Sequence, residues 1–274
     1  MSLQATIIDS ALDYESNSGN ITFDFAHTQI EFIKQHNLTL VWILETHAHA
    51  DHLSAAHYLR SQLGGKIAIG KYIIQAQQTF KDIFALSDTE ISVSGKEFDQ
   101  LLSHNDTLFI GDTAIKVIET PGHTKDSVTY LIEDNAFIGD TLFMPDSGSA
   151  RCDFPGGAAS ELYQSVKRLY ALADHTKLWM CHDYQPNGRQ LQFQTTVAES
   201  KLSNIHITKD VSLDHFVSIR QTRDSKLAVP RLLYPALQVN IKAGELPQAD
   251  EHQPAFFKIP VHILRHIVQT EDVK

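Results

Sequence analysis

The chain has 274 residues, of which 42% are hydrophobic and 20% charged, and its formal net charge is −10. This fits one or two globular domains and excludes collagenous and low-complexity chains. The acidic balance argues against a nucleic-acid partner, since phosphate binding needs clustered Lys and Arg. The sequence shows no signal-peptide pattern, no apolar run long enough for a bilayer, and too few cysteines for a disulfide framework. We therefore expect a cytoplasmic globular protein with no membrane partner.

Strand and helix patterns alternate through the first third of the chain. The almost continuous apolar run Leu38 to Leu44 is typical of a strand covered on both faces. Apolar residues at helical spacing predict helices on either side of it. In chain order we expect a strand at 5–9, a turn-like stretch at 13–20, a helix at 23–35, a strand at 38–44, a helix at 53–63, a strand at 66–69 and a helix at 72–84.

The second half of the chain is richer in short strands, which are divided by Gly-Asp, Pro-Gly and Asp-Asn turns. After residue 206 the chain becomes charged and then rich in proline, and it is too short for a good core of its own. We predict a catalytic domain at 1–205 and an extension at 206–274 packed on it. The expected elements are strands at 107–110, 113–119, 127–132, 136–138 and 178–181, and helices at 157–173, 199–205 and 212–227.

Histidine is frequent, with 15 in the chain, and its spacing points to metal chemistry. The sequence His47-x-His49-x-Asp51-His52 directly follows the apolar strand. In extended backbone His47 and His49 point to one side, while Asp51 and His52 turn away as a helix begins. Four metal-competent side chains within six residues indicate a metal site at this strand end, rather than a polar loop with incidental histidines.

Three further candidates also stand at the ends of predicted strands, where α/β sheets tend to place their sites. They are His123, Asp140 and His182. Each alone could be a polar strand cap. With the first motif they form a set of five His and two Asp, in which Asp140 could bridge two metals.

Four motifs built on these residues resemble the metallo-β-lactamase superfamily. They are THAHADH at 46–52, TPGH at 120–123, GDTLF at 139–143 and CHDY at 181–184, and the resemblance runs from about residue 5 to 205. It implies an α+β fold, a four-layer αββα sandwich with the metal site at one edge of its two sheets and a C-terminal extension. The reaction stays open, because this superfamily hosts many.

Further motifs resemble the persulfide dioxygenase (sulfur dioxygenase) family, in its longer bacterial branch. These motifs are Ile7–Asp9, Leu12–Tyr14, RCDF at 151–154, His182–Tyr184 and the tail 230–240. The resemblance implies oxidation of glutathione persulfide with O2 to sulfite and glutathione at one non-haem Fe(II) per chain. It implies His47, His123 and Asp140 as iron ligands, which agrees with the facial triad of Fe(II) oxygenases.

On that reading His49, Asp51, His52 and His182 orient the iron ligands, with Asp51 also a catalytic candidate. The His and Asp pattern is similar to glyoxalase II as well, which hydrolyses a glutathione thioester with two metals, but RCDF and the tail 230–240 fit the dioxygenases better. All seven ligands of such a hydrolase are present, so the ligand set leaves both open, and a non-catalytic iron or redox sensor is a third alternative. Zinc competes for such ligands, so recombinant protein could carry zinc.

Substrate contacts are expected from cationic and aromatic side chains near the motifs. The planar fork of Arg151 could reach a glutathione carboxylate, or pair with Asp153 in a structural loop salt bridge. Tyr184, Arg223 and Arg231 are further candidates for an anionic tripeptide, with a solvated surface role as the alternative for each Arg.

Three expectations concern the surroundings of the site. Asp183 is a catalytic candidate that could orient a metal ligand or hold its loop. Cys181 ends an apolar strand, so its thiol is expected to be buried. The resembling family has further strands before the segment matching Ile7–Asp9, so the first sheet could expose an edge that pairs with another chain in a homodimer.

Overall fold

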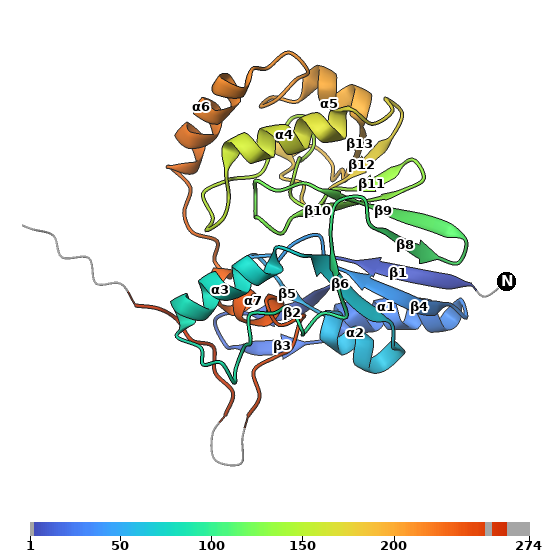
Figure 1. The fold of residues 1–274 in the computed structure, drawn as a ribbon, viewed down its shortest axis with the longest axis vertical. Helices are drawn as coiled ribbons and strands as arrows, with labels where there is room; N and C mark the ends of the chain where they lie inside the picture. Colours follow the sequence, from blue (N-terminus) through green and yellow to red (C-terminus); the bar gives the residue numbers. More distant parts are fainter. Residues whose placement is uncertain (1–2, 250–253, 262–274) are drawn as a thin grey trace, which may run out of the picture.

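The computed structural model describes residues 3–249 and 254–261. Two β-sheets pack face to face, and helices cover the outer face of each (Figure 1). The fold is therefore the four-layer αββα sandwich that the motifs predict. Segments 250–253 and 262–274 of the predicted extension lie outside the described residues.

The first sheet has four parallel strands in the order β1-β4-β6-β7. Parallel neighbours need crossover connections, which here carry helices over the outer face. In β4 the apolar run buries Leu40, Ile43 and Leu44. The strands are β1 (Gln4–Ile8), β4 (Thr39–Leu44), β6 (Lys66–Gly70) and β7 (Gln100–Leu102), and the helices are α1 (Asp24–Gln35), α2 (Ala56–Leu63) and α3 (Ile73–Phe84).

The second sheet has six strands in the order β13-β12-β11-β10-β9-β8, and only the β11–β12 pair is parallel. Its strands are β8 (Thr107–Ile110), β9 (Thr113–Glu119), β10 (Val128–Ile132), β11 (Asn135–Phe137), β12 (Lys177–Trp179) and β13 (Gln194–Thr196), and its helices are α4 (Ala159–Tyr170), α5 (Val197–Ser203) and α6 (Leu213–Asp224). A buried layer between the two sheets includes Leu44, Ile115 and Tyr130.

Within the stretch 13–20, expected to be turn-like, residues 16–19 form the turn of a hairpin, while 13–15 and 20 belong to its strands. β2 (Ala11–Glu15) pairs with β3 (Asn20–Thr22) on one side and with β5 (Leu53–Ser54) on the other. The pairing of Leu53 and Ser54 delays the start of α2 to Ala56, three residues after the predicted start. β3 was missed because two of its three residues are exposed and polar, so no alternating apolar pattern marks it.

The predicted extension contains a helix that the sequence patterns did not reveal, α7 (Leu233–Asn240). Pro235 suggests a break, but it lies in the first turn, where proline is tolerated. Ala236, Leu237 and Val239 are buried in the core of the first sheet. The extension thus supplies α6, which packs on α4, and α7, which packs on β5.

Within the described residues β1 pairs only with β4, so it forms one edge of the first sheet. This is the exposed edge expected above, and the homodimer it could support stays a prediction. No helix in the described part of the chain combines the length and apolarity needed to cross a membrane.

Candidate metal centre

The predicted metal ligands lie just after strands of both sheets. His47 and His49 follow β4, His123 follows β9 and Asp140 follows β11. None of the four is more than 9% exposed. Side chains far apart in the chain are therefore gathered into one buried cluster where the strands end.

Ligand atoms of His47, His123 and Asp140 lie within 4.8 Å of one another. Nε2 of His47 is 3.9 Å from Oδ2 of Asp140, and Nε2 of His123 is 3.7 Å from it. The other ring nitrogen of His123, Nδ1, donates to the carbonyl oxygen of Arg151 at 2.8 Å. His123 Nε2 therefore turns its lone pair to the cluster, as a metal ligand must.

His47 is oriented in the same way. The Thr46 hydroxyl donates to Asp9 at 2.9 Å and accepts from His47 Nδ1 at 3.0 Å, which leaves Nε2 as the unprotonated atom. Burial and the neighbouring imidazoles lower the pKa of His47 and keep its ring neutral. Among the described residues, His47 Nε2 and Asp140 Oδ1 are buried and have no hydrogen-bond partner. A bound cation would satisfy both atoms, so the trio fits a metal ion.

A second group of donors adjoins the trio. Ligand atoms of His49, Asp51 and His52 also lie within 4.8 Å of one another. His182 Nε2 is 3.3 Å from Asp51 Oδ2 and 3.5 Å from Asp140 Oδ2, so it joins the two groups. His49 Nδ1 and His52 Nε2 are buried without a partner in the described part of the chain. The structure thus brings all seven predicted groups together, with donors enough for one ion or two.

Asp9 contacts the loop that carries His47 and His49, and the sequence patterns did not identify it as a functional residue. Its Oδ1 accepts from the Thr46 backbone N–H at 2.7 Å and lies 3.0 Å from His49 Nε2. Burial raises the pKa of Asp9, but the adjacent His49 outweighs it and the net pKa is lowered. Asp9 follows β1 as the other ligands follow their strands, and that position in the sequence was the available signal.

Asn240, at the end of α7, holds the same loop from the other side. Its amide nitrogen donates to the carbonyl oxygens of His49 and His52, both at 2.8 Å. Its amide oxygen accepts from the backbone N–H of Ser54 at 2.8 Å. The extension therefore fixes the backbone that carries the second donor group.

His123 is positioned by a close contact between two backbones. Gly122 has φ +136°, and a β-carbon there would stand 2.2 Å from the backbone nitrogen of Leu162 in α4. Ser165 of the same helix donates from its hydroxyl to the carbonyl oxygen of Pro121 at 2.6 Å. The turn that presents His123 is thereby fastened to α4, and only glycine fits at 122.

A cavity of about 650 Å³ opens beside the trio. Arg151 lines it, but all its nitrogens are engaged: Nε and Nη2 donate to the two oxygens of Asp153 at 2.6 and 2.7 Å, and Nη1 donates to the carbonyl oxygen of Ala228 at 2.7 Å. The guanidinium also lies 5.1 Å from the ring centre of Phe154. The geometry favours the structural salt bridge over a free anion-binding fork.

The other predicted substrate residues separate into two groups. Tyr184 and Arg223 line the cavity. Tyr184 packs its ring at 82° to that of Phe143, with 5.1 Å between centroids. Arg231 is exposed and is not among the described residues that line this cavity. The structure thus supports the surface alternative for Arg231.

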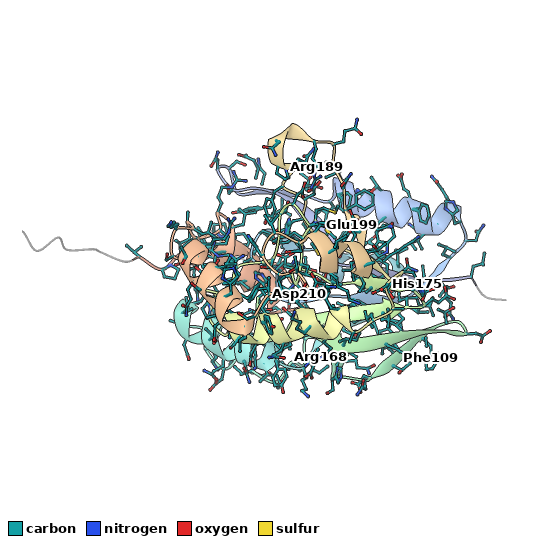
Figure 2. All side chains as sticks on the ribbon, turned by 90° about the horizontal axis from the view of Figure 1, so that it is seen from above. Phe109, Arg168, His175, Arg189, Glu199 and Asp210 are labelled. Atoms are coloured by element: carbon teal, nitrogen blue, oxygen red, sulfur yellow. The ribbon has the colours of Figure 1, made fainter. Side chains whose placement is uncertain are left out.

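The carboxylate of Asp183, predicted as a catalytic candidate, is hydrogen-bonded to residues of its own loop. Its oxygens accept from Arg189 Nη1 and Nη2, each at 2.6 Å, and from the backbone N–H of Gln192 at 2.7 Å. The Asp183 side chain is 1% exposed. Arg189, which also donates to Asp146 at 2.8 Å, lies on a loop at the periphery (Figure 2). These contacts favour the alternative that Asp183 holds its loop, and the catalytic assignment stays a prediction.

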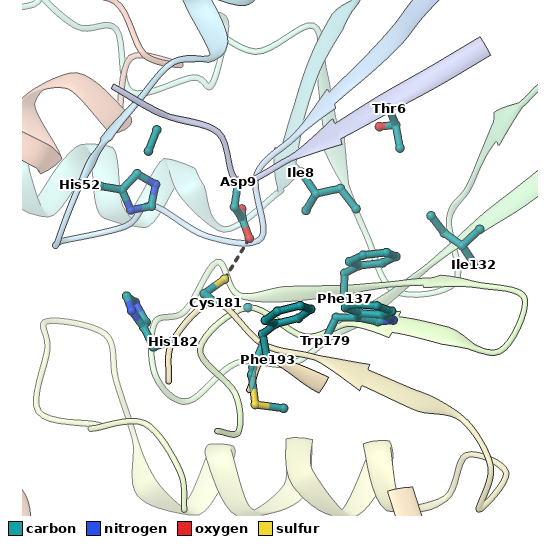
Figure 3. Close-up of a pocket in the computed structure, with 13 residues that line it drawn as sticks. Thr6, Ile8, Asp9, His52, Ile132, Phe137, Trp179, Cys181, His182 and Phe193 are labelled. Carbon is teal, nitrogen blue, oxygen red and sulfur yellow. Dashed lines mark hydrogen bonds between the residues drawn. The ribbon is translucent and has the colours of Figure 1, made fainter. Parts of the chain in front are cut away.

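The prediction that Cys181 is buried is wrong, because the strand ends two residues earlier, at Trp179. Cys181 lies beside a second cavity, of about 580 Å³, that is lined by apolar side chains such as Ile8 and Phe137 (Figure 3). Its thiol donates to Asp9 Oδ2 at 3.3 Å. The protein atoms around the sulfur keep water away from a charged thiolate, and the nearby carboxylates repel it. Both effects raise the pKa of Cys181 well above its usual range, so the thiol stays protonated.

Residues 5–182 match the family model described as the metallo-beta-lactamase superfamily. The chain belongs to the metallo-β-lactamase superfamily. The match spans both strand-end donor groups up to His182, so membership rests on the part of the chain that builds the site.

Relatives within the superfamily carry different names. Glyoxylase B2 of Dictyostelium discoideum is 45% identical over 264 residues, covering 96% of this chain and 90% of that protein. The mitochondrial persulfide dioxygenase ETHE1 of Mus musculus is 28% identical over 222 residues, covering 80% and 75%. The crystal structure of ETHE1 from Myxococcus xanthus is similar with a TM-score of 0.69 and 27% identity, covering 88% of this chain and 89% of that chain.

Proposed function

We propose that this chain is a persulfide dioxygenase that oxidises glutathione persulfide with O2 and water to sulfite and glutathione at one Fe(II). The observation that carries the proposal is the trio His47, His123 and Asp140, in which two buried atoms have no hydrogen-bond partner among the described residues. Two imidazoles and one carboxylate with open positions are typical of non-haem Fe(II) oxygenases. The similarity to persulfide dioxygenases supports the same choice.

When bound, Fe(II) would supply an open coordination face for O2 and the persulfide sulfur. The residues of the chain prepare that face. Thr46 and the Arg151 carbonyl fix the ring tautomers of His47 and His123, so that each offers Nε2. Asp51 lies 3.5 Å from His52 and 3.3 Å from His182 and holds both rings beside the trio. In this proposal the second group orients the ligands.

A second candidate is a two-metal hydrolase of glutathione thioesters. Two observations favour it. In the group His49, Asp51 and His52, buried nitrogens have no hydrogen-bond partner in the described part of the chain, and a relative 45% identical is named a glyoxylase. This group, together with His182 and Asp140, would hold the second ion. In such a centre, two ions would activate water and polarise a thioester carbonyl.

Oxygen uptake distinguishes the two candidates. Protein stripped of metal and reconstituted with Fe(II) is mixed with glutathione persulfide on an oxygen electrode, and sulfite is measured in the same sample. We expect one O2 consumed for each sulfite formed. A parallel sample with a glutathione thioester should be inactive. Thioester cleavage without oxygen uptake would replace the dioxygenase with the hydrolase.

A further inference from the structure

Two buried side chains line the cavity without using all their donors. His206 is 4% exposed and Arg220 is 2% exposed, and both line the cavity that reaches the metal ligands. His206 Nε2 and Arg220 Nε have no hydrogen-bond partner within the described residues. An unpaired buried donor costs free energy, so such atoms are uncommon unless a ligand completes them.

The hydrogen bonds around His206 show which of its nitrogens carries the proton. Nδ1 accepts from the backbone N–H of Ser149 at 2.9 Å. In a neutral ring the proton is then on Nε2, which makes Nε2 a donor. Burial, followed by the charges of Arg220 and Arg223, lowers the pKa of His206 to about 4. At neutral pH the cavity wall therefore presents a neutral N–H group.

The position of this ring is tightly determined. Asn204 accepts from the backbone N–H of His206 at 3.0 Å and donates to the carbonyl oxygen of Gly148 at 3.0 Å. Gly148 has φ +93°, and a β-carbon there would lie 2.1 Å from His206 Nδ1. A ring held this firmly with one donor left over is suited to binding rather than to filling space.

Arg220 is held in a similar way. One Nη donates to the carbonyl oxygen of Ser149 at 2.8 Å, and the other pairs with Asp224. Asp224 also accepts from the backbone N–H of Cys152 at 2.9 Å. Since Asp224 offsets the charge of Arg220, the remaining cation on this wall is Arg223, for which no ion pair is found in residues 3–249 and 254–261. On this part of the wall, Arg223 is a cation that can attract an anionic compound.

The part of the cavity wall formed by His206, Arg220 and Arg223 is connected to the metal ligands through a few residues. Ser149 binds His206 and Arg220, and the carbonyl of Arg151 binds His123. Ser149 and Arg151 are two residues apart, which is at most about 7 Å of backbone. Since His123, Asp140, His206 and Arg220 line one cavity, a compound with its sulfur at the trio could place an acidic group against this wall.

We infer that His206 and Arg220 form a carboxylate-binding site that determines which sulfur compounds the enzyme accepts. The inference rests on the proposed function, because it places the reacting sulfur at the trio. The two unpaired N–H groups would each donate to the carboxylate, and Arg223 would add attraction from the exposed side of the cavity.

The test measures binding rather than turnover. Iron-loaded protein is titrated anaerobically by calorimetry with glutathione, and separately with glutathione diethyl ester, which lacks carboxylates. His206→Asn keeps an acceptor for Ser149 but removes the cavity donor, and Arg220→Lys keeps the charge but removes Nε. The matched control is His215→Asn, at an exposed position on α6. Circular dichroism and melting curves select variants that fold.

We expect each variant to weaken glutathione binding at least tenfold and to change diethyl ester binding less than twofold, with the control unchanged. Unchanged glutathione affinity in both variants would overturn the inference. So would an equal loss for both compounds, which would mean a structural role, or a wild-type protein that does not bind glutathione. Selective loss in a protein that consumes no O2 would keep this site and reject the dioxygenase.

Discussion

The cavity of about 650 Å³ has a metal end and an opposite wall, which differ in how far their polar atoms are hydrogen-bonded or ion-paired. At the metal end, buried atoms such as His47 Nε2 and Asp140 Oδ1 have no hydrogen-bond partner among the described residues. Along the wall, Arg151 is fully paired and Arg220 is paired with Asp224, and single donors such as His206 Nε2 and Arg220 Nε are left over within the described residues. The comparison shows that the presence of a charged residue near a site says less than which of its atoms remain unsatisfied.

Removing a ligand at the metal end should have the largest effect. His123→Ala deletes one of three ligands and should abolish iron binding, with kcat lowered by about a thousandfold or more. Metal analysis of the purified protein and oxygen uptake measure the two effects. His215→Ala, on the exposed face of α6, is the control. A variant with full iron content and full turnover would remove His123 from the ligand set.

Loosening the loop behind the ligands should have an intermediate effect. Asn240→Ala removes three hydrogen bonds to the backbone of His49, His52 and Ser54. Since groups that orient ligands typically contribute about 10–100-fold to metal affinity, we expect a loss in that range. Competition with a metal chelator measures it. Wild-type affinity in a variant of normal stability would show that α7 does not support the site.

Acid should destabilise the folded chain through His206 in the cavity wall. The pKa of His206 is about 4 in the folded chain against an ordinary value of 6.5, so only the unfolded chain takes up this proton between those values. Stability from this residue is therefore complete above pH 6.5 and is lost as the pH falls towards 4, by up to about 3 kcal/mol.

Urea unfolding between pH 7 and 4.5 measures this contribution. The free energy of unfolding should fall more steeply with acid in the wild type than in His206→Asn. His215→Asn should follow the wild type. Parallel curves for the wild type and His206→Asn would contradict the assignment.

Breaking a satisfied pair should have a smaller effect on catalysis. Arg151→Ala removes the hydrogen bonds to Asp153 and to the carbonyl oxygen of Ala228. The cavity wall near residues 153 and 228 should become less ordered, while the metal ligands stay in place. We expect KM to rise about threefold to tenfold with kcat little changed. Arg231→Ala, outside the cavity lining, should leave both constants unchanged. A large fall in kcat would place Arg151 in the chemistry.

The smallest expected effect on turnover is that of Asp183→Asn. This change weakens the contacts with Arg189 and Gln192, so the melting temperature should fall while kcat stays within about twofold. Thermal melts and oxygen uptake on the same samples separate the two. A loss of turnover with an unchanged melting temperature would support the catalytic role.

The difference between the two ends also explains what the sequence could predict. Candidate ligands such as His47 and His123 stand in short motifs at the ends of predicted strands. The fold class and the set of donor residues could therefore be predicted from local sequence. Which distant side chains pair with one another depends on the three-dimensional arrangement of the chain. Nothing in the order of residues shows that Asp183 meets Arg189 or that α7 returns to the loop at His49.

The contact between Gly122 and Leu162 has a consequence for how the molecule can evolve. No series of gradually larger side chains is open at position 122, because the first added carbon already meets the backbone of α4. Substitution at 122 would therefore move the turn that carries His123. Cavity positions such as the half-exposed Leu227 and Pro230, both in the extension, carry no such constraint from α4 and are places where the substrate pocket can change.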